Sequence, residues 1–537
     1  MKLASHAFPI LLFASTLVAC AAHERPRHSS RDAGGLDAAS DGARLAASDA
    51  SSAAILDAAD GLRLPRSDAG ASLLPPNAGV APAPCPATRF APAAFSDAGT
   101  LDDAGASPSA PSLTRHPFLG AVTDRSMRIW FQSSAAADSC IEYWPLAHPE
   151  QSSTALGPQL GPDRDFTGTV TLAGLSAAES YGYRVWLAEP GQTFVAQDAR
   201  AGTFKTAPPV DVPGRFRLIF GADISGSATP IFDEMRAQSP DLVLLLGDLA
   251  YMDGLAPTLA AFRDKDRANW AIPALARLAS AVPTLGMWDD HDIIDNFWPG
   301  KDNLLPIAHE AFSEYVASRD PDPIRAGEFY FDFAIGDVGI FVLDERSHRS
   351  PNTDPDGPNK TMLGAQQRAD LLGWLAGSPA AVKIIASPVL VSDFGNTGDD
   401  AWRGFKHERE EILSFIAERG IPNVLILSGD QHWSGLFKLV RGAPAYTFYE
   451  FEPTPLSKSA AKAPGMIGGD IVAEFGGDFV YGVVDVDTVS KPPRVDLTLC
   501  RTKVACRPGS EPAPVDGVAP FTVHLRGAAA RGWNAAP

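Results

Sequence analysis

Four short acidic motifs each follow an apolar run that has the length and composition of a buried β-strand. Parallel sheets covered on both faces are built from such runs, and ligands collect outside the carboxyl ends of their strands. Carboxylates and a histidine that converge at such an edge repel one another unless cations lie between them. The sequence therefore predicts a dinuclear metal centre. Its motifs are G-A-D-I-S with Asp223, G-D-L-A-Y with Asp248 and Tyr251, W-D-D-H-D with Asp290 and His291, and S-G-D-Q-H with Asp430 and His432.

The size and charge of the chain limit its domain number and its partners. A chain of 537 residues is too long for one hydrophobic core, so we expect two or three domains with extensions. Asp and Glu number 64 against 45 Lys and Arg, which gives a formal charge of −19. This excess of acid disfavours binding to nucleic acid, because phosphates attract basic surfaces. We predict no nucleic-acid-binding surface and a monomer.

The first 20 residues have the pattern of an export signal. Met1-Lys2 precedes an apolar stretch over residues 8–18, which is too short to span a bilayer permanently. The tetrapeptide that ends at Cys20, L-V-A-C, resembles a bacterial lipobox, in which the cysteine is acylated. We expect residues 1–20 to be a lipoprotein signal peptide. The mature protein would be exported to the cell envelope, at the outer membrane or cell surface, held only by its N-terminal lipid, or released. The alternative is an ordinary signal with a chance cysteine.

The remaining chain divides into three segments by composition. Residues 21–110 are rich in Ala, Asp, Ser and Pro and predict a disordered tether. Residues 111–208 contain short alternating strands that resemble a fibronectin type III β-sandwich. Residues 211–530 alternate strand-like and helix-like patterns, which indicates a layered α/β domain. Cys500 and Cys506 are close enough in sequence for a local disulfide, and a pairing of Cys85 with Cys140 is the other option.

The first two motifs of the α/β domain are separated by one crossover helix. The apolar run before Asp223, the helical I-F-D-E-M-R-A-Q and the run before Asp248 form a βαβ unit of normal length. Such a unit places Asp223 and Asp248 side by side at one sheet edge. Three apolar stretches over residues 479–525 predict strands that close a second sheet.

The residue types suggest which side chains share each cation. Asp248 is the predicted bridging ligand because it lies in the tightest strand-to-turn motif. A first pocket is expected from Asp223, Asp248, Tyr251 and His432, where a phenolate suits ferric iron. A second pocket of oxygen donors, Asp248, Asp290 and Asp430, favours calcium, magnesium or manganese. Asp289 is expected to support its neighbours.

Six segments occur in an order that resembles a known enzyme family. The chain resembles the calcineurin-like metallophosphoesterases, and more closely the alkaline phosphatase D or PhoD-like family. The resemblance covers about residues 111–530 and implies a four-layer α/β sandwich, two mixed sheets flanked by helices, after a small all-β sandwich. Its segments are G-D-L-A-Y, W-D-D-H-D-I-I-D-N, L-D-E-R-S-H-R, D-A-W-R-G-F-K-H-E-R, S-G-D-Q-H and Y-E-F-E-P-T-P-L-S.

The resemblance implies a phosphoesterase that acts on small-molecule phosphomonoesters or phosphodiesters. A metal-bound hydroxide would attack phosphorus, His291 would protonate the leaving group, and Arg346 and Arg349 would neutralise the phosphate. The implied cations are Fe³⁺ with Ca²⁺, and Mg²⁺, Mn²⁺ or Zn²⁺ are alternatives. Two departures matter: Asp223 replaces a cysteine frequent in the family, and Ser387 stands near a position where many superfamily members have histidine. Fewer nitrogen ligands favour calcium at the second site.

Two other functions are compatible with the same residues. The first is a non-catalytic cell-surface binding protein whose metal sites are structural and whose fibronectin-like domain holds a partner. A structural site would need neither His291 nor the two arginines, which favours the enzyme. The second keeps the chemistry but changes the substrate to phospholipid head groups or nucleotides, and the sequence does not distinguish these from other phosphoesters.

Overall fold

The computed structural model describes residue 85 and residues 110–197, 200–225, 230–393, 400–465, 470–502, 506, 522–527 and 533–535. The predicted signal peptide, the lipidation at Cys20 and all of the predicted tether except residues 85 and 110 lie outside the described residues. Within the described part, no helix combines the length and apolar character needed to cross a membrane.

The N-terminal described region consists of two antiparallel sheets that share buried side chains, as a β-sandwich does. The first sheet has the order β1-β2-β5, from β1 (Phe118–Val122), β2 (Ser126–Gln132) and β5 (Thr167–Ala173). The second has the order β4-β3-β6-β7, with β8 also paired to β6. Its strands are β3 (Asp138–Pro145), β4 (Ser153–Leu156), β6 (Ser180–Ala188), β7 (Val195–Ala196) and β8 (Gly202–Lys205). A disulfide joins Cys85 to Cys140 in β3.

The α/β region contains two seven-stranded mixed sheets. Sheet A has the order β11-β10-β9-β19-β20-β21-β22 and sheet B the order β12-β13-β14-β15-β17-β16-β18. Sheet A consists of β9 (Arg215–Gly221), β10 (Leu242–Leu246), β11 (Thr284–Met287), β19 (Val480–Asp487), β20 (Arg494–Arg501), β21 (Thr522–Gly527) and β22 (Trp533–Ala535). Sheet B consists of β12 (Phe331–Ile335), β13 (Val338–Val342), β14 (Val382–Ala386), β15 (Val424–Leu427), β16 (Ser434–Arg441), β17 (Tyr446–Glu452) and β18 (Ile471–Phe475).

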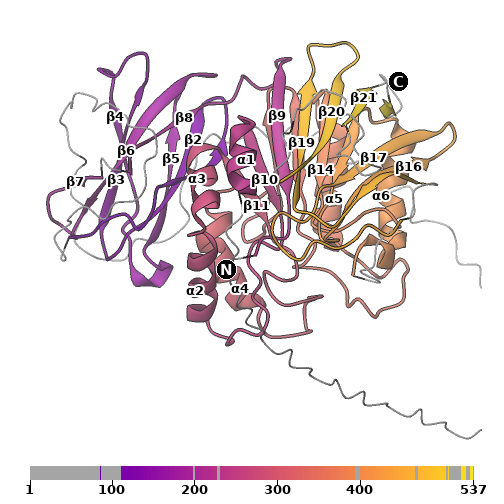
Figure 1. Cartoon of the computed structure of the whole chain (residues 1–537), viewed down its shortest axis with the longest axis horizontal. Coiled ribbons are helices and arrows are strands. Elements are labelled where there is room, and N and C mark those ends of the chain that lie inside the picture. Colours follow the sequence, from indigo (N-terminus) through magenta and orange to yellow (C-terminus); the bar gives the residue numbers. More distant parts are fainter. Residues whose placement is uncertain are drawn as a thin grey trace, which may run out of the picture. The chain divides into compact units, whose positions relative to one another are not determined.

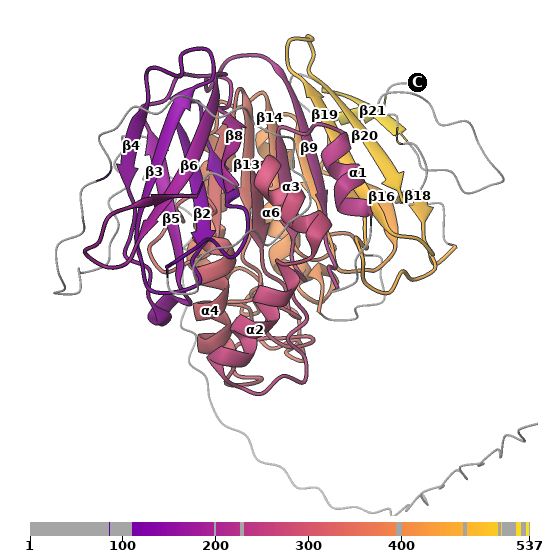
Figure 2. The same ribbon diagram turned by 60° about the vertical axis from the view of Figure 1, so that its left-hand side comes forward.

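Helices cover the outer faces of both sheets, which gives the predicted four layers (Figure 1 and Figure 2). On sheet A lie α1 (Ile231–Ala237) and α3 (Pro273–Ala281), with α2 (Leu259–Asn269) and α4 (Leu305–Phe312) packed on each other beside it. On sheet B lie α5 (Gly364–Gly377) and α6 (Lys406–Arg419). Short turns of helix occur at Pro162–Arg164, Ser313–Ala317 and Trp402–Gly404.

The position of β10 between two buried faces explains why its sequence is a continuous apolar run. Leu242, Leu244 and Leu246 join the core that reaches sheet B. Val243 and Leu245 point to the opposite face and join the core under α1 and α3. Alternate side chains of a strand point to opposite faces, so a strand between two covered faces is apolar throughout.

The predicted βαβ unit is present, but the C-terminal strands have a different place from the one expected. Strands β9 and β10 pair in parallel, with Phe220 beside Leu244, and α1 connects them. The late strands β19 to β21 do not close a separate sheet, because β19 pairs antiparallel with β9 and so extends sheet A. A disulfide joins Cys500 in β20 to Cys506.

Candidate metal centre

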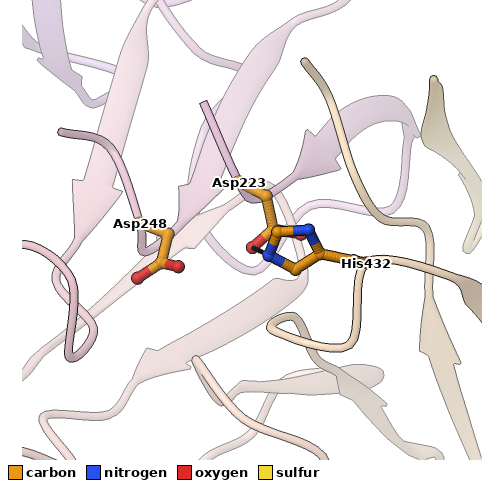
Figure 3. A group of neighbouring side chains, drawn as sticks. All are labelled: Asp223, Asp248 and His432. Atoms are coloured by element: carbon orange, nitrogen blue, oxygen red, sulfur yellow. Dashed lines mark ion pairs between the residues drawn. The ribbon is translucent and has the colours of Figure 1, made fainter. Parts of the chain in front are cut away.

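The four acidic motifs meet where strands of the two sheets end. Asp223 follows β9, Asp248 follows β10, and Asp289, Asp290 and His291 follow β11; these three strands are parallel neighbours in sheet A. Asp430 and His432 follow β15 of sheet B. Figure 3 shows Asp223, Asp248 and His432 converging from these turns. The structure therefore brings together the four predicted ligand carboxylates and His432, with Asp289 and His291 beside them.

Several of these residues have backbone angles that L-residues seldom adopt. The φ angles of Asp223, Asp248, Asp430 and His432 are +64°, +52°, +86° and +58°. Each such residue costs about 1–3 kcal/mol and persists only where the surroundings enforce it. Gly247, at φ +92°, lies where an added Cβ would be 2.6 Å from the Cβ of Asp289. This strain at the ends of three different strands marks the turns as a functional region.

The first ligand group is Asp223, Asp248 and His432, with Tyr251 beside it. Their potential ligand atoms lie within 4.8 Å of one another, and His432 Nε2 is 3.9 Å from Asp223 Oδ1. Tyr251 Oη lies 3.3 Å from the same Nε2. Burial, followed by the charges of Asp248 and Asp223, raises the pKa of the Tyr251 phenol. A phenolate at this position therefore needs a compensating cation.

The second ligand group contains only aspartates and His291. Asp248, Asp290 and His291 form one cluster, and Asp289, Asp290 and Asp430 form another. Burial, then the charges of Asp290 and Asp289, raises the pKa of Asp248 well above its ordinary value. Burial, then the charges of Asp289 and Asp290, does the same for Asp430. Four acids sharing so small a volume cannot all ionise without cations among them.

The pattern of missing hydrogen bonds fits cation binding. Both carboxylate oxygens of Asp223, one of Asp248 and one of Asp290 are buried and have no hydrogen-bond partner. Buried polar atoms are almost always satisfied, so an orphaned set of carboxylate oxygens that face one another needs an explanation. Hard divalent or trivalent cations supply it, since they prefer oxygen ligands and accept histidine as well. These residues therefore fit a dinuclear centre.

His291 lies against the second ligand group and is oriented by an aspartate that the sequence reasoning missed. Its backbone N–H donates to Asp248 Oδ1 at 3.2 Å, and its ring centroid is 4.3 Å from that of Tyr251. Its Nδ1 lies 2.5 Å from Asp253 Oδ2, and Nε2 lies 3.8 Å from Asp295 Oδ1. The only available signal for Asp253 was its place two residues after Tyr251 in the same turn.

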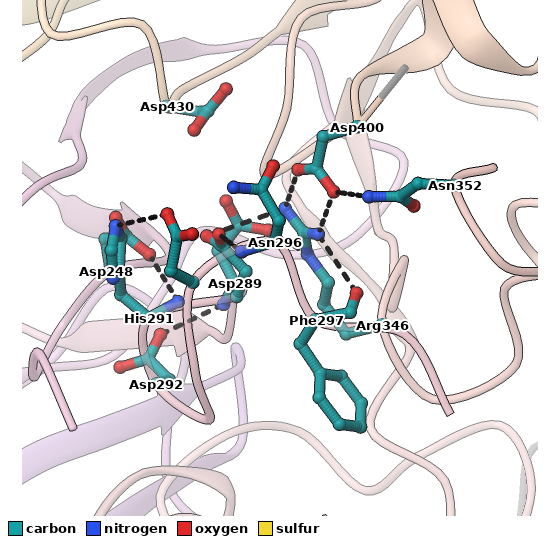
Figure 4. Close-up of polar contacts among 12 residues, drawn as sticks. Asp248, Asp289, His291, Asp292, Asn296, Phe297, Arg346, Asn352, Asp400 and Asp430 are labelled. Carbon is teal, nitrogen blue, oxygen red and sulfur yellow. Dashed lines mark hydrogen bonds and ion pairs between the residues drawn. The ribbon is translucent and has the colours of Figure 1, made fainter. Parts of the chain in front are cut away.

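The two arginines predicted to neutralise phosphate are buried in an ion-pair network. Arg346 Nε donates to Asp289 Oδ1 at 2.5 Å, and its two terminal nitrogens donate to the carboxylate of Asp400 at 2.9 and 2.8 Å (Figure 4). Arg349 donates to the carbonyl of Asp400 and stacks 4.8 Å from the ring of Phe405. Neither arginine side chain is exposed to solvent. Their burial argues against the predicted contact with phosphate and assigns them a positioning role.

Asp400 is the centre of this network and was not singled out from the sequence. Besides the arginines, it accepts a hydrogen bond from Asn352 Nδ2 at 2.5 Å. Against the effect of burial, the charges of Arg346 and Arg349 lower the pKa of Asp400. Asp400 is the first residue of the D-A-W-R-G-F-K segment, and the sequence of this segment gave no indication of its partners.

The carboxylate of Asp292 connects two of these turns through hydrogen bonds to their backbone. Its Oδ1 accepts hydrogen bonds from the N–H groups of Leu249 and Ala250, and its Oδ2 accepts one from Asp289, each at 2.9 Å. One carboxylate thus ties the Asp248 turn to the Asp289 turn. Burial raises its pKa to about 7 although these three bonds oppose the shift.

Other residues near the site have structural partners. Ser387 Oγ donates to Glu345 at 2.7 Å, and Trp402 Nε1 donates to the same carboxylate at 2.8 Å. Trp288 Nε1 donates to Asp344 at 2.9 Å. The backbone N–H of Asn296 donates to Asp290 Oδ2, so Asn296 supports a predicted ligand through its main chain.

Comparisons with known proteins agree with this geometry. Residues 221–466 match the family model described as PhoD-like phosphatase. Alkaline phosphatase D of Bacillus subtilis (strain 168) is 25% identical over 254 residues, which are 38% of this chain and 43% of that protein. The chain therefore aligns with less than half the length of this curated relative.

Two solved structures share the fold. The structure of PhoD has a TM-score of 0.64 at 19% identity and covers 79% of this chain and 93% of its own. A purple acid phosphatase from yellow lupin seeds has a TM-score of 0.55 at 14% identity and covers 73% of this chain and 72% of its own. At these identities, both likenesses concern the fold of the chain alone.

Proposed function

We propose that the protein is an exported metal-dependent phosphoesterase that hydrolyses phosphomonoesters, phosphodiesters or both, and the match of residues 221–466 to the family model described as PhoD-like phosphatase supports this. The single observation that carries the proposal is the set of buried carboxylate oxygens of Asp223, Asp248 and Asp290 that have no hydrogen-bond partner, with His291 beside them. A binding protein with a structural metal would not need the oriented histidine.

The chain offers two adjoining sets of ligands. Asp223, Tyr251 and His432 would hold the first cation, which we propose to be Fe³⁺ because a phenolate suits it. Asp290 and Asp430 would hold the second, proposed to be Ca²⁺, and Asp248 would contact both. When bound, the pair supplies Lewis acidity that activates water and screens the charge of the phosphate.

His291 would act on the leaving group. Asp253 accepts from Nδ1 and leaves Nε2 as the atom that can donate a proton to the departing alkoxide. Arg346 holds Asp289 and Asp400 rather than the substrate, so the ligand turns stay in place while the charge on the phosphate changes.

The proposed reaction is tested by comparing nitrophenyl phosphate and bis-nitrophenyl phosphate as substrates of the purified protein, with calcium supplied and then chelated. We expect calcium-dependent hydrolysis, and the ratio of the two rates gives the preference between monoester and diester. Asp248→Asn should lose at least about a hundredfold in kcat, because it removes the shared ligand. Asp264→Asn, a change at an exposed residue of α2, is the matched control. Wild-type turnover by Asp248→Asn contradicts the bridging role.

The proposed identity of the first cation has a spectroscopic test. A tyrosinate bound to ferric iron colours a protein purple or brown, so the absorption band should vanish in Tyr251→Phe. A colourless, active protein that contains only zinc contradicts this proposal.

Export with a lipid anchor is a further part of the proposal, and it is supported by the sequence of residues 1–20. Metabolic labelling with palmitate should mark the wild-type protein in a bacterial host and leave Cys20→Ala unlabelled. Equal labelling of both proteins would exclude acylation at Cys20.

A further inference from the structure

The segment Leu456–Ala461 is fastened directly to the turn that carries Asp223. Leu456 N–H donates to the carbonyl of Ala222 at 2.8 Å, and the N–H groups of Ser457 and Lys458 donate to the carbonyl of Asp223 at 3.0 and 3.1 Å. Ser225 N–H donates to Ser457 Oγ at 2.9 Å, and Ser225 Oγ donates to the Ser457 carbonyl at 2.8 Å. These hydrogen bonds fix the segment relative to one predicted ligand.

The same segment also holds His432, the other end of the first ligand group. His432 Nδ1 lies 3.1 Å from the carbonyl of Ser459, which leaves Nε2 facing Asp223 and Tyr251. The N–H of Ala461 donates to the carbonyl of His432 at 2.7 Å. The segment thus bridges the turns of sheet A and sheet B at the metal centre.

Lys458 is the charged residue of this segment. Its Nζ lies 3.7 Å from the centroid of the Tyr251 ring, and the side chain is half-buried. A lysine ammonium over a tyrosine face is attracted to the ring and kept within a narrow volume. Among the described residues, Lys458 forms no ion pair with a carboxylate, unlike Arg346 and Arg349. Its charge is therefore available to a ligand at the metal centre.

We propose that Lys458 binds a non-bridging oxygen of the substrate phosphate and favours dianionic phosphomonoesters over monoanionic phosphodiesters. This inference rests on the proposed phosphoesterase function. The ammonium group acts as a compact point charge, and its attraction to phosphate grows with the charge of the phosphate. The same site contains several buried carboxylates, Asp223 and Asp248 among them, which repel a dianion more strongly than a monoanion. A fixed cation on the Tyr251 side compensates for that repulsion.

The test combines direct binding with kinetics. Lys458→Met removes the charge and keeps the apolar stem, Lys458→Arg restores a charge, and Lys438→Met removes an exposed lysine of β16 as the control. Calorimetric titration of the metal-loaded proteins with inorganic phosphate should show binding about tenfold weaker in Lys458→Met. Near wild-type affinity is expected in Lys458→Arg and Lys438→Met. Metal content, measured by elemental analysis, should be equal in all four proteins.

Kinetics then separate phosphate binding from general damage. In Lys458→Met, kcat/KM for nitrophenyl phosphate should fall several-fold more than that for bis-nitrophenyl phosphate. Unchanged phosphate affinity, or equal losses for the two substrates, overturns the inference. If Lys458→Met does not fold or hold metal, Lys458→Gln provides the same comparison with a polar, uncharged side chain.

The outcome for Lys458 is distinguishable from the outcome for the proposed function. A wild-type protein with confirmed metal that binds no phosphate and hydrolyses neither substrate contradicts the phosphoesterase itself. A wild-type protein that hydrolyses them, alongside a Lys458→Met variant with unchanged phosphate affinity, removes only the role of Lys458.

Discussion

At the scale of single residues, the metal centre is a cluster of buried carboxylates. The cationic side chains of the protein do not balance their negative charge. Burial raises the pKa of Asp223 to about 6 and that of Asp292 to about 7, against an ordinary value of 3.8. Burial together with neighbouring charges raises the pKa of Asp248 and Asp430. The folded protein without cations thus holds protons that the unfolded chain would release.

These shifts predict how the stability of the metal-free protein depends on pH. The folded pKa values exceed the unfolded ones, so the stabilisation by bound protons is fully present below 3.8 and is lost as the pH rises through about 6 and about 7. We expect the free energy of unfolding of the chelated protein to fall by at least about 2 kcal/mol from pH 5 to pH 8. Urea unfolding at the two pH values measures it.

The metal-loaded protein is the control for this measurement. Cations stabilise ionised carboxylates, so its stability should change little over the same range. A chelated protein that is more stable at pH 8 than at pH 5 contradicts the proposed proton uptake.

Another prediction at the residue scale concerns Asp253, which contacts Nδ1 of His291. Asp253→Asn should lower kcat about 10- to 100-fold and alter the pH profile of kcat, because the partner that orients the ring is weakened. KM and metal content should stay close to wild type. Asp295→Asn is the matched control, since Asp295 lies 3.8 Å from the other ring nitrogen and is largely exposed. Equal effects of both substitutions would contradict a specific role of Asp253.

At the scale of elements, the site depends on turns that end strands abruptly. An aspartate with positive φ follows each of the strands β9, β10 and β15. Hydrogen bonds to Asp292 join the turns after β10 and β11. Strands β10 and β15 are apolar and fully buried, and β9 is apolar and buried over its last four residues, so all three hold the turns firmly at the sheet edge. Glycine at position 247 allows the turns after β10 and β11 to approach closely.

Gly247→Ala is therefore expected to damage both stability and metal binding. Position 247 has φ +92° and an added Cβ would lie 2.6 Å from Asp289 Cβ, whereas at Gly254, with φ +72°, it would meet nothing within 4 Å. Gly254→Ala should cost about 1 kcal/mol through backbone strain alone. Gly247→Ala should cost at least about 3 kcal/mol and reduce metal content. Thermal unfolding and elemental analysis compare the pair, and similar losses would exclude the steric argument.

At the scale of the whole described molecule, the β-sandwich and the α/β region share a core. Ile129 and Phe131 of β2 pack into one cluster, and Trp130 between them packs with Phe118, Trp270 and Tyr315 into the other. Trp130 Nε1 donates to the carbonyl of Glu314 at 2.8 Å. On the α/β side, α2 carries Asn269, which hydrogen-bonds the carbonyl of Leu249 beside Asp248. The β-sandwich therefore packs near the end of α2, and α2 in turn holds the turn that carries Asp248.

This shared core predicts joint unfolding of the two regions. Wild-type protein should show one calorimetric transition, and Trp130→Ala should lose about 3–5 kcal/mol and separate into two transitions. Trp144→Ala is the control, because Trp144 is buried on β3 in the other sheet of the sandwich. It should destabilise the sandwich without separating the transitions. Two transitions in the wild-type protein would contradict the coupling.

Much of the site could be predicted because its signals are local. Asp223 and Asp248 each follow an apolar run that reads as a strand, and one helix of ordinary length separates them, so their proximity follows from the βαβ rule. Asp290, Asp430 and His432 carry the same strand-then-acid pattern. The structure places all five in shared clusters. Asp253 and Asp400 carry no such pattern. Their roles, and that of Asp292 at the end of W-D-D-H-D, depend on partners that only folding brings near.

The sequence by itself determined which segments become strands, which turns carry acid and that these acids need cations, because periodicity and residue type act between near neighbours in the chain. Only the tertiary structure decided that β19 pairs with β9, that Arg346 and Arg349 face Asp400 rather than solvent, and that Lys458 lies over Tyr251. Those pairings join residues tens to hundreds of positions apart. Which distant residues pair depends on how all buried surfaces of the chain pack together. No local sequence pattern encodes that packing.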